Sequence, residues 1–447
     1  MPYRPSTAHA SLGSAFFDIV EPARFPSLTL RYRNQGWAER VGLGALTDAE
    51  WMLHFGGFTP LPGSFPEPLA LRYHGHQFRH YNPDLGDGRG FLFAQLLDRD
   101  GRLLDFGTKG SGRTPWSRGG DGKLTLKGGV REVLATEMLD ALGVTTSQSF
   151  SLIETGEALH RGDEPSPTRS AVLVRLSHGH VRIGSFQRFA YLEEPENIAR
   201  LLEHSIKYYV PVSGDDRAAA FLGQVVQNVA RLGAQWMAAG FVHGVLNTDN
   251  INITGESFDY GPWRFLPAYD LDHTAAYFDH TGLYAYGRQA EALLWNLWRL
   301  AECLVPLSSA KALEAALAGF SPAFHAALDA AVLRRLGLKS RGPDADQALA
   351  AGWWEWLATS QTTFEAAFFR CWRGQVPADA AYDGARAALE GAEPMGQPHP
   401  YFEGAPCTML IDEVEAIWAP IAASDDWSLF HQKIAQIAVM RDAYLSG

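Results

Sequence analysis

Residues 86–109 read GDGRGFLFAQLLDRDGRLLDFGTK, and this stretch decides the fold. Its first five residues, Gly86–Gly90, form a glycine-rich turn. Two apolar or alternating runs follow at 91–97 and 103–109, and the polar residues between them are typical of a turn. The pattern predicts two antiparallel strands, in which side chains alternate between faces. Lys109 then ends the second strand on its more polar side.

A helix is expected next, because apolar residues recur at every fourth position between about 126 and 142 and a glycine follows. Glu132 lies off this apolar stripe and can turn toward Lys109. A glycine-rich turn, a strand lysine and a helix glutamate in this order are typical of the amino-terminal lobe of protein kinases, where they hold nucleotide phosphates. Glu137 is the alternative partner of the lysine, and a plain turn is the alternative interpretation of the glycines.

The composition argues against several classes of protein. The 447 residues include 38 Lys and Arg against 50 Asp and Glu, a formal net charge of −12, so neither a nucleic-acid face nor a basic membrane anchor is expected. The three cysteines lie far apart without CxxC spacing, which argues against a disulfide scaffold or zinc site. No apolar signal segment opens the chain, and Arg299 and Glu302 interrupt the apolar stretch ALLWNLWRLAECLVPL. We expect a cytoplasmic protein that binds neither nucleic acid nor membrane.

The order of patterns predicts a two-lobed chain of the α+β class. Residues 1–192 are expected to form a mixed β/α amino-terminal lobe, with an irregular lead-in over residues 1–85. Strand-like patterns recur at 149–154, 171–176 and 181–189. Residues 193–447 are expected to form a mainly helical carboxy-terminal lobe, and the helical pattern at 408–445 looks like a cap on this larger lobe.

Two arginines stand at the ends of the segment VRLSHGHVR. Arg175 and Arg182 would converge on one phosphate if a turn at residues 178–179 folded this segment back. Otherwise they are two exposed arginines. The sequence alone leaves both interpretations open.

The segment HGVLNTDN at 243–250, followed by Asp259, looks like the catalytic loop and the metal-binding element of kinases. Asn250 and Asp259 supply oxygen ligands of the kind that Mg²⁺ accepts, and Mn²⁺ accepts them as well. Kinases place their proton-accepting aspartate two residues after the histidine, and here that position is Val245. Kinase catalysis therefore cannot simply be assumed.

At these residues the chain resembles the selenoprotein O family, whose members are protein adenylyltransferases. The resemblance covers roughly residues 70–307. The strings that carry it are YHGHQF, LGDGRG, TKGSGRTPWSRGGDGK, VREVLATEMLDALGVTTS, SHGHVRIGSF, HGVLNTDNINITGESFDYGP and YAYGRQ. The resemblance implies a protein-kinase-like fold of two lobes and ATP as co-substrate.

The resemblance also implies roles for individual residues. Asp249 is implied as the proton acceptor, Asn250 and Asp259 as Mg²⁺ ligands, and Asp259 as a contact of ATP too. Glu132 is the expected partner of the lysine in the same site. In this family the nucleotide lies inverted relative to kinases, so that its α-phosphorus faces the acceptor hydroxyl. The implied nucleotide contacts are Gly86, Gly88, Arg89, Lys109, Asp121, Gly122, Arg175 and Arg182.

The predicted function is transfer of AMP from ATP to Ser, Thr or Tyr hydroxyls of proteins, with release of pyrophosphate and with Mg²⁺ or Mn²⁺ as cofactor. One alternative is a conventional kinase that transfers the γ-phosphoryl group. The other is a nucleotide-binding pseudokinase scaffold without chemistry, which Val245 would suit. Many members of the family end near a selenocysteine or cysteine, whereas the last cysteine here is Cys407, so redox control through a tail thiol is not expected.

Overall fold

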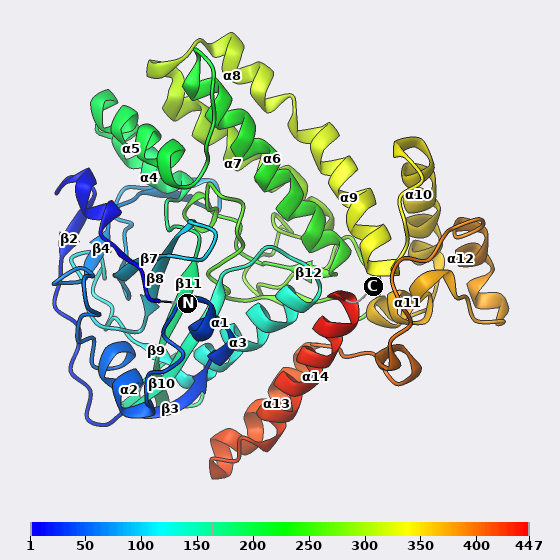
Figure 1. Ribbon diagram of the computed structural model, residues 1–447, viewed down its shortest axis with the longest axis horizontal. Coiled ribbons are helices and arrows are strands. Elements are labelled where there is room, and N and C mark those ends of the chain that lie inside the picture. Colours follow the sequence, from blue (N-terminus) through cyan, green and yellow to red (C-terminus); the bar gives the residue numbers. More distant parts are fainter. Residues whose placement is uncertain (1, 163, 446–447) are drawn as a thin grey trace.

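The structure is a computed structural model that describes residues 2–162 and 164–445. A curled, nine-stranded antiparallel sheet occupies its amino-terminal part (Figure 1). The strands of this sheet are β1 (Pro5–Ser6), β2 (Phe17–Ile19), β3 (Thr29–Arg33), β4 (Leu69–Leu71), β7 (Leu92–Leu97), β8 (Leu103–Lys109), β9 (Leu124–Thr125), β10 (Gln148–Leu159) and β11 (Thr168–Ser177). They pair in the order β2-β4-β7-β8-β11-β10-β3, with β1 beside β7 and β9 beside β11.

Helices surround the sheet and make up most of the later chain (Figure 1). Two small hairpin-like pairs, β5 (Gly75–Gln77) with β6 (His80–Asn82) and β12 (Phe241–Val242) with β13 (Arg264–Phe265), lie outside the main sheet. The fold is therefore mixed α/β. The helices are α1 (Gln35–Arg40), α2 (Asp48–Phe55), α3 (Leu126–Ala141), α4 (Ile183–Tyr191), α5 (Pro195–Tyr208), α6 (Arg217–Ala238), α7 (Gln289–Leu304), α8 (Ala310–Leu317), α9 (Phe320–Leu336), α10 (Pro343–Thr359), α11 (Phe364–Arg370), α12 (Asp383–Ala388), α13 (Ile411–Ser424) and α14 (Ser428–Leu445).

The predicted hairpin and helix are both confirmed. Strands β7 and β8 pair antiparallel, and β8 also pairs with β11, where Lys109 lies opposite Leu173. Phe106 of β8 packs with the rings of Phe55 and Phe150 in the core. Helix α3 begins after Thr125, whose side chain accepts a hydrogen bond from the Gly128 N–H and so caps the first turn. The apolar stripe of α3 is buried, and the helix packs on β10 and β11.

The expectation of an irregular lead-in over residues 1–85 is wrong. This segment contributes strands β1 to β4 to the sheet and contains helices α1 and α2. The strands of the lead-in are two to five residues long, which is too short for a hydrophobic period to stand out. Helix α2 did carry a local signal, because Thr47 and Glu50 form a capping box at its start.

The strand-like pattern at 181–189 is also wrong, whereas those at 149–154 and 171–176 are confirmed as parts of β10 and β11. Residues Ile183–Tyr191 form helix α4, and Ile183, Phe186 and Phe189 are its buried face. Their spacing of three residues is helical rather than alternating.

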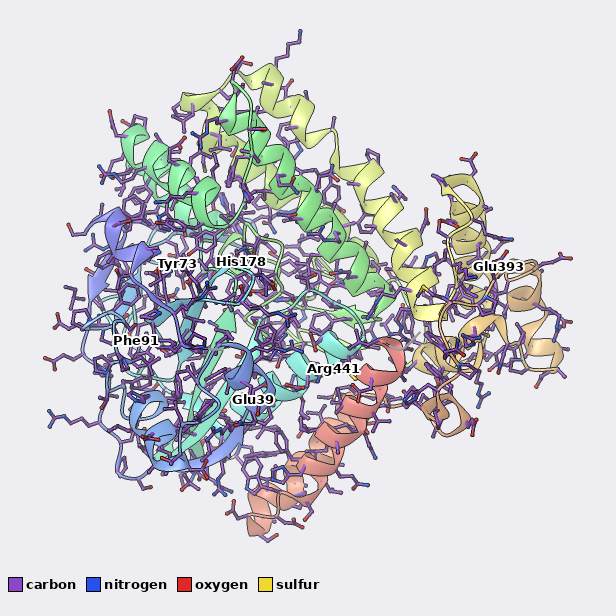
Figure 2. The ribbon with its side chains drawn as sticks, in the orientation of Figure 1. Glu39, Tyr73, Phe91, His178, Glu393 and Arg441 are labelled. Atoms are coloured by element: carbon purple, nitrogen blue, oxygen red, sulfur yellow. The ribbon has the colours of Figure 1, made fainter. Side chains whose placement is uncertain are left out.

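The tail does not simply cap the later helices. Helices α13 and α14 lie along α3, which Figure 1 shows as the red and cyan helices side by side. Arg441 of α14 reaches α3, where its guanidinium lies 2.6 Å from Glu137 and 2.7 Å from Asp140 (Figure 2). Tyr444, near the end of α14, packs on the ring of Trp372. The tail thus links α3 to the later helices, a tertiary arrangement that helical periodicity does not report.

One helical stretch, Ala310–Leu336, is long and apolar enough to cross a membrane by length and composition alone. This stretch consists of two helices, α8 and α9, with a break between them near Gly319. Leu313, Leu317 and Phe320 are buried in the core of the molecule. These three apolar residues therefore contribute to the core of the molecule.

Glu256 makes stability depend on pH. Burial raises the pKa of its carboxyl from 4.5 to about 7, although the side chain accepts a hydrogen bond of 2.7 Å from the His178 N–H. An acid whose pKa is higher in the folded state binds its proton more tightly there, so the folded form loses stability as the pH rises from about 4.5 to about 7. The pKa difference corresponds to about 3 kcal/mol.

We therefore expect Glu256→Gln to raise the midpoint of thermal unfolding at pH 8 by a few degrees and to change it little at pH 4.5, because the glutamine amide stays neutral. Thermal unfolding between pH 4.5 and pH 8 measures this. The exposed Glu67 provides the control substitution Glu67→Gln. Parallel pH curves for the Glu256→Gln variant and the parent would contradict the assignment.

Candidate functional site

A cavity of about 660 Å³ lies between the glycine-rich turn, the end of β8 and the loops that carry Asp249 and Asp259. Its lining includes every predicted site residue except Glu132. Tyr73, which Figure 2 labels, also lines this cleft. The predicted residues found in the lining are Gly86, Gly88, Arg89, Lys109, Asp121, Gly122, Arg175, Arg182, Asp249, Asn250 and Asp259.

Lys109 is the centre of an ion cluster in this cleft. Its ammonium contacts the Glu132 carboxylate and lies 2.8 Å from Oδ1 of Asp259. Arg175 lies 3.3 Å from the same oxygen. Glu137, the alternative partner, accepts a hydrogen bond from Tyr32 instead and pairs with Arg441. The structure therefore joins the strand lysine, the helix glutamate and the loop aspartate in one cluster, with Glu132 as the partner.

Asp259 is held in an ionised form. Burial by itself would raise the pKa of its carboxyl, but Lys109, Arg175 and Arg89 together hold that pKa well below its usual range. The backbone at Asp259 has φ of 62°, in the left-handed region that few residues other than glycine, asparagine and aspartate adopt. Such backbone strain is typical of functional sites. The carboxylate is thus a fixed negative charge among cations.

The two arginines do converge. The guanidinium carbons of Arg175 and Arg182 lie 5.5 and 5.3 Å from the centre of the Phe258 ring. Arg182 also donates a hydrogen bond of 3.0 Å to Asp87 in the glycine-rich turn. Both side chains are buried and line the cleft, so the interpretation as two exposed arginines is excluded.

The glycine-rich turn is closed by the loop that carries Asp121 and Gly122, a contact that the sequence did not predict. Thr114 Oγ1 and Ser117 Oγ donate hydrogen bonds of 2.5 Å to the carbonyl oxygens of Asp87 and Gly88. A Cβ at Gly88 would lie 2.7 Å from the Trp116 carbonyl oxygen, and one at Gly86 would collide with the Trp116 ring. The glycines are therefore required by the close approach of this loop. The string TKGSGRTPWSRGGDGK marked this loop in the sequence but did not indicate that the loop contacts the glycine-rich turn.

Asp121 and Gly122 follow on the same loop. Asp121 is bound by Arg161, whose Nη1 lies 2.8 Å from its carboxylate, and by the Lys123 N–H, which donates to it at 3.0 Å. Gly122 has φ of 72°, and a Cβ there would collide with the backbone of Gly112. The loop is thus folded back on itself at the mouth of the cleft.

Asp249 sits in the short 3₁₀ turn Thr248–Asn250. Its Oδ1 is shielded from solvent and has no hydrogen-bond partner in the described part of the chain, and burial raises its pKa to about 6. Asn250 donates to the Val245 carbonyl oxygen at 3.0 Å. A carboxylate with a raised pKa and a free oxygen is suited to accept a proton.

Strand β5 supports this turn from the other side, which explains the string YHGHQF. The His76 N–H donates to Thr248 Oγ1 at 2.7 Å, and the Phe78 N–H donates to Asn247 at 3.0 Å. A Cβ at Gly75 would lie 3.1 Å from Oδ1 of Asp249. These supporting residues were missed by the sequence reasoning, because their contacts join segments about 170 residues apart.

The described residues contain no group of three or more His, Cys, Asp and Glu side chains that could hold a metal ion. The cleft does present the amide of Asn250 and the carboxylate of Asp259, and such oxygens suit a hard cation that also takes phosphate oxygens as ligands. The two residues therefore fit a divalent ion that arrives with a nucleotide better than an ion held by the protein alone.

Comparison with known proteins agrees with this geometry. Residues 2–390 match the family model described as protein adenylyltransferase SelO. The chain is 46% identical to the protein nucleotidyltransferase YdiU of Gloeobacter violaceus, with 97% of this chain and 94% of that protein covered. It is 44% identical to the protein of the same name from Synechocystis, with 97% of each covered. It is 54% identical to that of Synechococcus elongatus over 76% of this chain and 69% of the relative.

The match extends over most of the chain and includes the turn, the lysine, the glutamate and the two acidic loops that form the cleft. Nucleotidyltransferases of this family use ATP as substrate. The chain therefore belongs to the SelO family and is a nucleotidyltransferase.

Proposed function

We propose that this enzyme is a protein adenylyltransferase, which transfers AMP from ATP to Ser, Thr or Tyr hydroxyls of proteins and releases pyrophosphate. The observation that carries the proposal is the single cleft in which Lys109, Arg175 and Arg182 face Asp249. Three cations and an unpaired carboxylate in the lining of one cleft suit a triphosphate whose α-phosphorus is presented to an acceptor. The nucleotide then lies inverted relative to kinases.

Asp249 is the proton acceptor in this proposal. The acceptor oxygen forms a bond to the α-phosphorus while its proton passes to the Asp249 carboxylate, and the bond from the α-phosphorus to the bridging oxygen breaks. The shielded Oδ1 and the pKa of about 6 support this role, because a base should hold its proton only weakly at neutral pH. Hydrogen bonds from the His76 N–H to Thr248 and from the Phe78 N–H to Asn247 fix the position of this turn.

Lys109, Arg175 and Arg182 neutralise the charge that grows on pyrophosphate as it leaves. Fixed cations in a cleft need no rearrangement during the reaction, so they lower the barrier more than solvent does. Glu132 and Asp259 orient the lysine, since both carboxylates contact its ammonium. The glycine-rich turn and Arg89, with Asp121 and Gly122, complete the nucleotide site.

Asn250 and Asp259 would hold Mg²⁺ or Mn²⁺, which would supply further neutralisation of phosphate charge when bound. We also propose that the chain forms two lobes of a protein-kinase-like fold, with residues 1–192 in one and 193–447 in the other. The cleft between the strand-borne lysine and the later acidic loops supports that division. A cytoplasmic location is part of the same proposal.

The test is incubation of the protein with casein as a generic acceptor and with ATP labelled either at the α-phosphate or at the γ-phosphate. We expect label from the α-phosphate on protein hydroxyls and pyrophosphate in equal amount. Label from the γ-phosphate, with ADP as product, would instead identify a kinase. Nucleotide binding without transfer of either label would identify a scaffold.

A further inference from the structure

A second cavity, of about 530 Å³, adjoins the nucleotide cleft on the far side of the Lys109–Glu132 pair. It lies between the first two turns of α3, the segment 260–264, the pair Tyr277 and Phe278, and α13. Its lining contains seven cationic side chains and three carboxylates, although the whole chain carries a net charge of −12. The cations are Arg89, Lys109, Lys123, Lys127, Arg131, Arg161 and Arg264.

Two of these cations form no close ion pair in the described part of the chain, although Glu415 lies near enough to act on both electrostatically. In the described part of the chain, no carboxylate oxygen lies within 4 Å of Arg131 or Arg264. Both guanidiniums donate to one carbonyl oxygen, that of Trp263, at 3.4 and 2.8 Å. Arg131 also stacks over the Trp263 ring, 4.9 Å from its centre. Two positive groups are thus held together by a single neutral acceptor.

This arrangement is costly unless an anion binds there. Burial and the neighbouring Arg264 lower the pKa of Arg131 to about 10, and the charge of Glu415 opposes this shift only in part. By contrast, the buried side chains of Arg182 and Arg335 each contact a carboxylate, on Asp87 and Glu365. Glu415 lines the cavity but is paired with Lys127 at 2.7 Å. The remaining charge of the two arginines is therefore available to a ligand.

Other features of the cavity favour an anion on a protein segment. The first turn of α3 lines the cavity, and helix starts favour negative charge. At the rim, Tyr277 is 80% exposed and Phe278 is 43% exposed. Exposed aromatic residues beside arginines are typical of protein-binding surfaces. The cavity also shares Arg89, Lys109, Lys123 and Arg161 with the nucleotide cleft.

We propose that this cavity, with Arg131 and Arg264 at its base, binds an acidic segment of the acceptor protein and so selects acceptors that carry Asp or Glu near the modified hydroxyl. The inference rests on the proposed transfer of AMP to proteins. A segment bound here lies against the Lys109–Glu132 pair, and the acceptor chain would extend from there along the nucleotide cleft toward Asp249. The nucleotide has its own cations in that cleft and leaves these two arginines free.

The test is direct binding, which needs no transfer. A fluorescein-labelled peptide with one tyrosine among glutamates is titrated with the full-length protein, saturated with a non-hydrolysable ATP analogue, at fixed ionic strength near 0.15 M. A matched peptide carries glutamine in place of each glutamate. We expect the acidic peptide to bind more tightly, and the variant with both Arg131→Gln and Arg264→Gln to bind it on the order of 10²-fold more weakly. Arg99→Gln, in the exposed β7–β8 turn, is the control and should change nothing.

Several results would overturn the inference. These are equal affinity for the acidic and the neutral peptide, unchanged affinity in the double variant, or loss of peptide binding when the ATP analogue is added. Inorganic phosphate is also added as a competitor, to measure whether it displaces the peptide. If phosphate protects the two arginines from chemical modification and no peptide does, the ligand is a small anion and the acceptor assignment fails.

A charge-reversal variant distinguishes the loss of the binding site from a loss of folding. The variant with both Arg131→Glu and Arg264→Glu should reject the acidic peptide and gain affinity for a lysine-rich version of it, because the charge of this arginine pair is reversed. A variant that has merely lost its structure would bind neither peptide. If no transfer of AMP to any protein occurs while the acidic peptide still binds as described, the proposed function fails and the binding site stands.

Discussion

Asp259→Asn is expected to lower the rate of AMP transfer by on the order of 10³-fold or more, with little loss of folding stability. The carboxylate lies 2.8 Å from the Lys109 ammonium and 3.3 Å from Arg175, and it is a proposed metal ligand. Asparagine has nearly the same shape but no charge. The lysine then keeps only Glu132 as an ionic partner, and the cation that accompanies ATP loses its charged ligand.

Asparagine is the informative substitution because of the backbone. Asp259 has φ of 62°, and asparagine tolerates this left-handed conformation, whereas alanine would cost about 1 kcal/mol in strain. A loss of activity in Asp259→Asn is therefore due to the charge. Initial rates with α-labelled ATP, together with thermal unfolding, separate the two effects.

The chain offers a close control for this variant. Asp425 also has a left-handed backbone, with φ of 56°, and it also pairs with two cations, Arg31 and Arg169. It lies at the end of α13, outside the cleft. Asp425→Asn should leave transfer unchanged. A drop of less than about tenfold in Asp259→Asn, or an equal drop in both variants, would show that Asp259 has no special role in catalysis.

The parts of the site that sequence could predict are those that local pattern encodes. The alternation in 103–109 placed Lys109 at the end of a strand, and the spacing of four in α3 left Glu132 off the apolar stripe. Order along the chain then suggested that both meet the later acidic loop, and the contacts of Lys109 with Glu132 and Asp259 confirm the meeting. The hydrophobic period located the strand and the helix, and the order of the motifs along the chain indicated which of their charged residues meet.

The rest depends on contacts between distant segments. Nothing local in HGHQF indicates that its backbone would bind Asn247 and Thr248, because the hydrogen bonds join residues 169 and 172 positions apart. The docking of Thr114 and Ser117 on the glycine-rich turn is similar, since polar side chains in a loop do not reveal their acceptors. The short strands of residues 1–85 gain their stability from the sheet rather than from their own sequence, so propensity alone missed them.

Asp249→Asn is expected to lower the turnover rate by about 10²- to 10⁴-fold while ATP binding is kept, because a general base acts on the acceptor rather than on the nucleotide. The amide has the same shape and cannot take a proton. The contacts that hold the turn come from Thr248, Asn247 and Asn250, so they persist in the variant. Titration with a fluorescent ATP analogue measures binding, and single-turnover transfer measures chemistry.

Substitution of the two carboxylates of the cleft, Asp249 and Asp259, should therefore have different effects. Asp259→Asn is expected to weaken ATP binding as well as transfer, because it removes a partner of Lys109, whereas Asp249→Asn should affect transfer alone. Asp272→Asn, at an exposed loop position, is the control and should affect neither. If Asp249→Asn keeps nearly full transfer, the acceptor hydroxyl loses its proton to another group, and the unpaired Oδ1 of Asp249 needs another explanation.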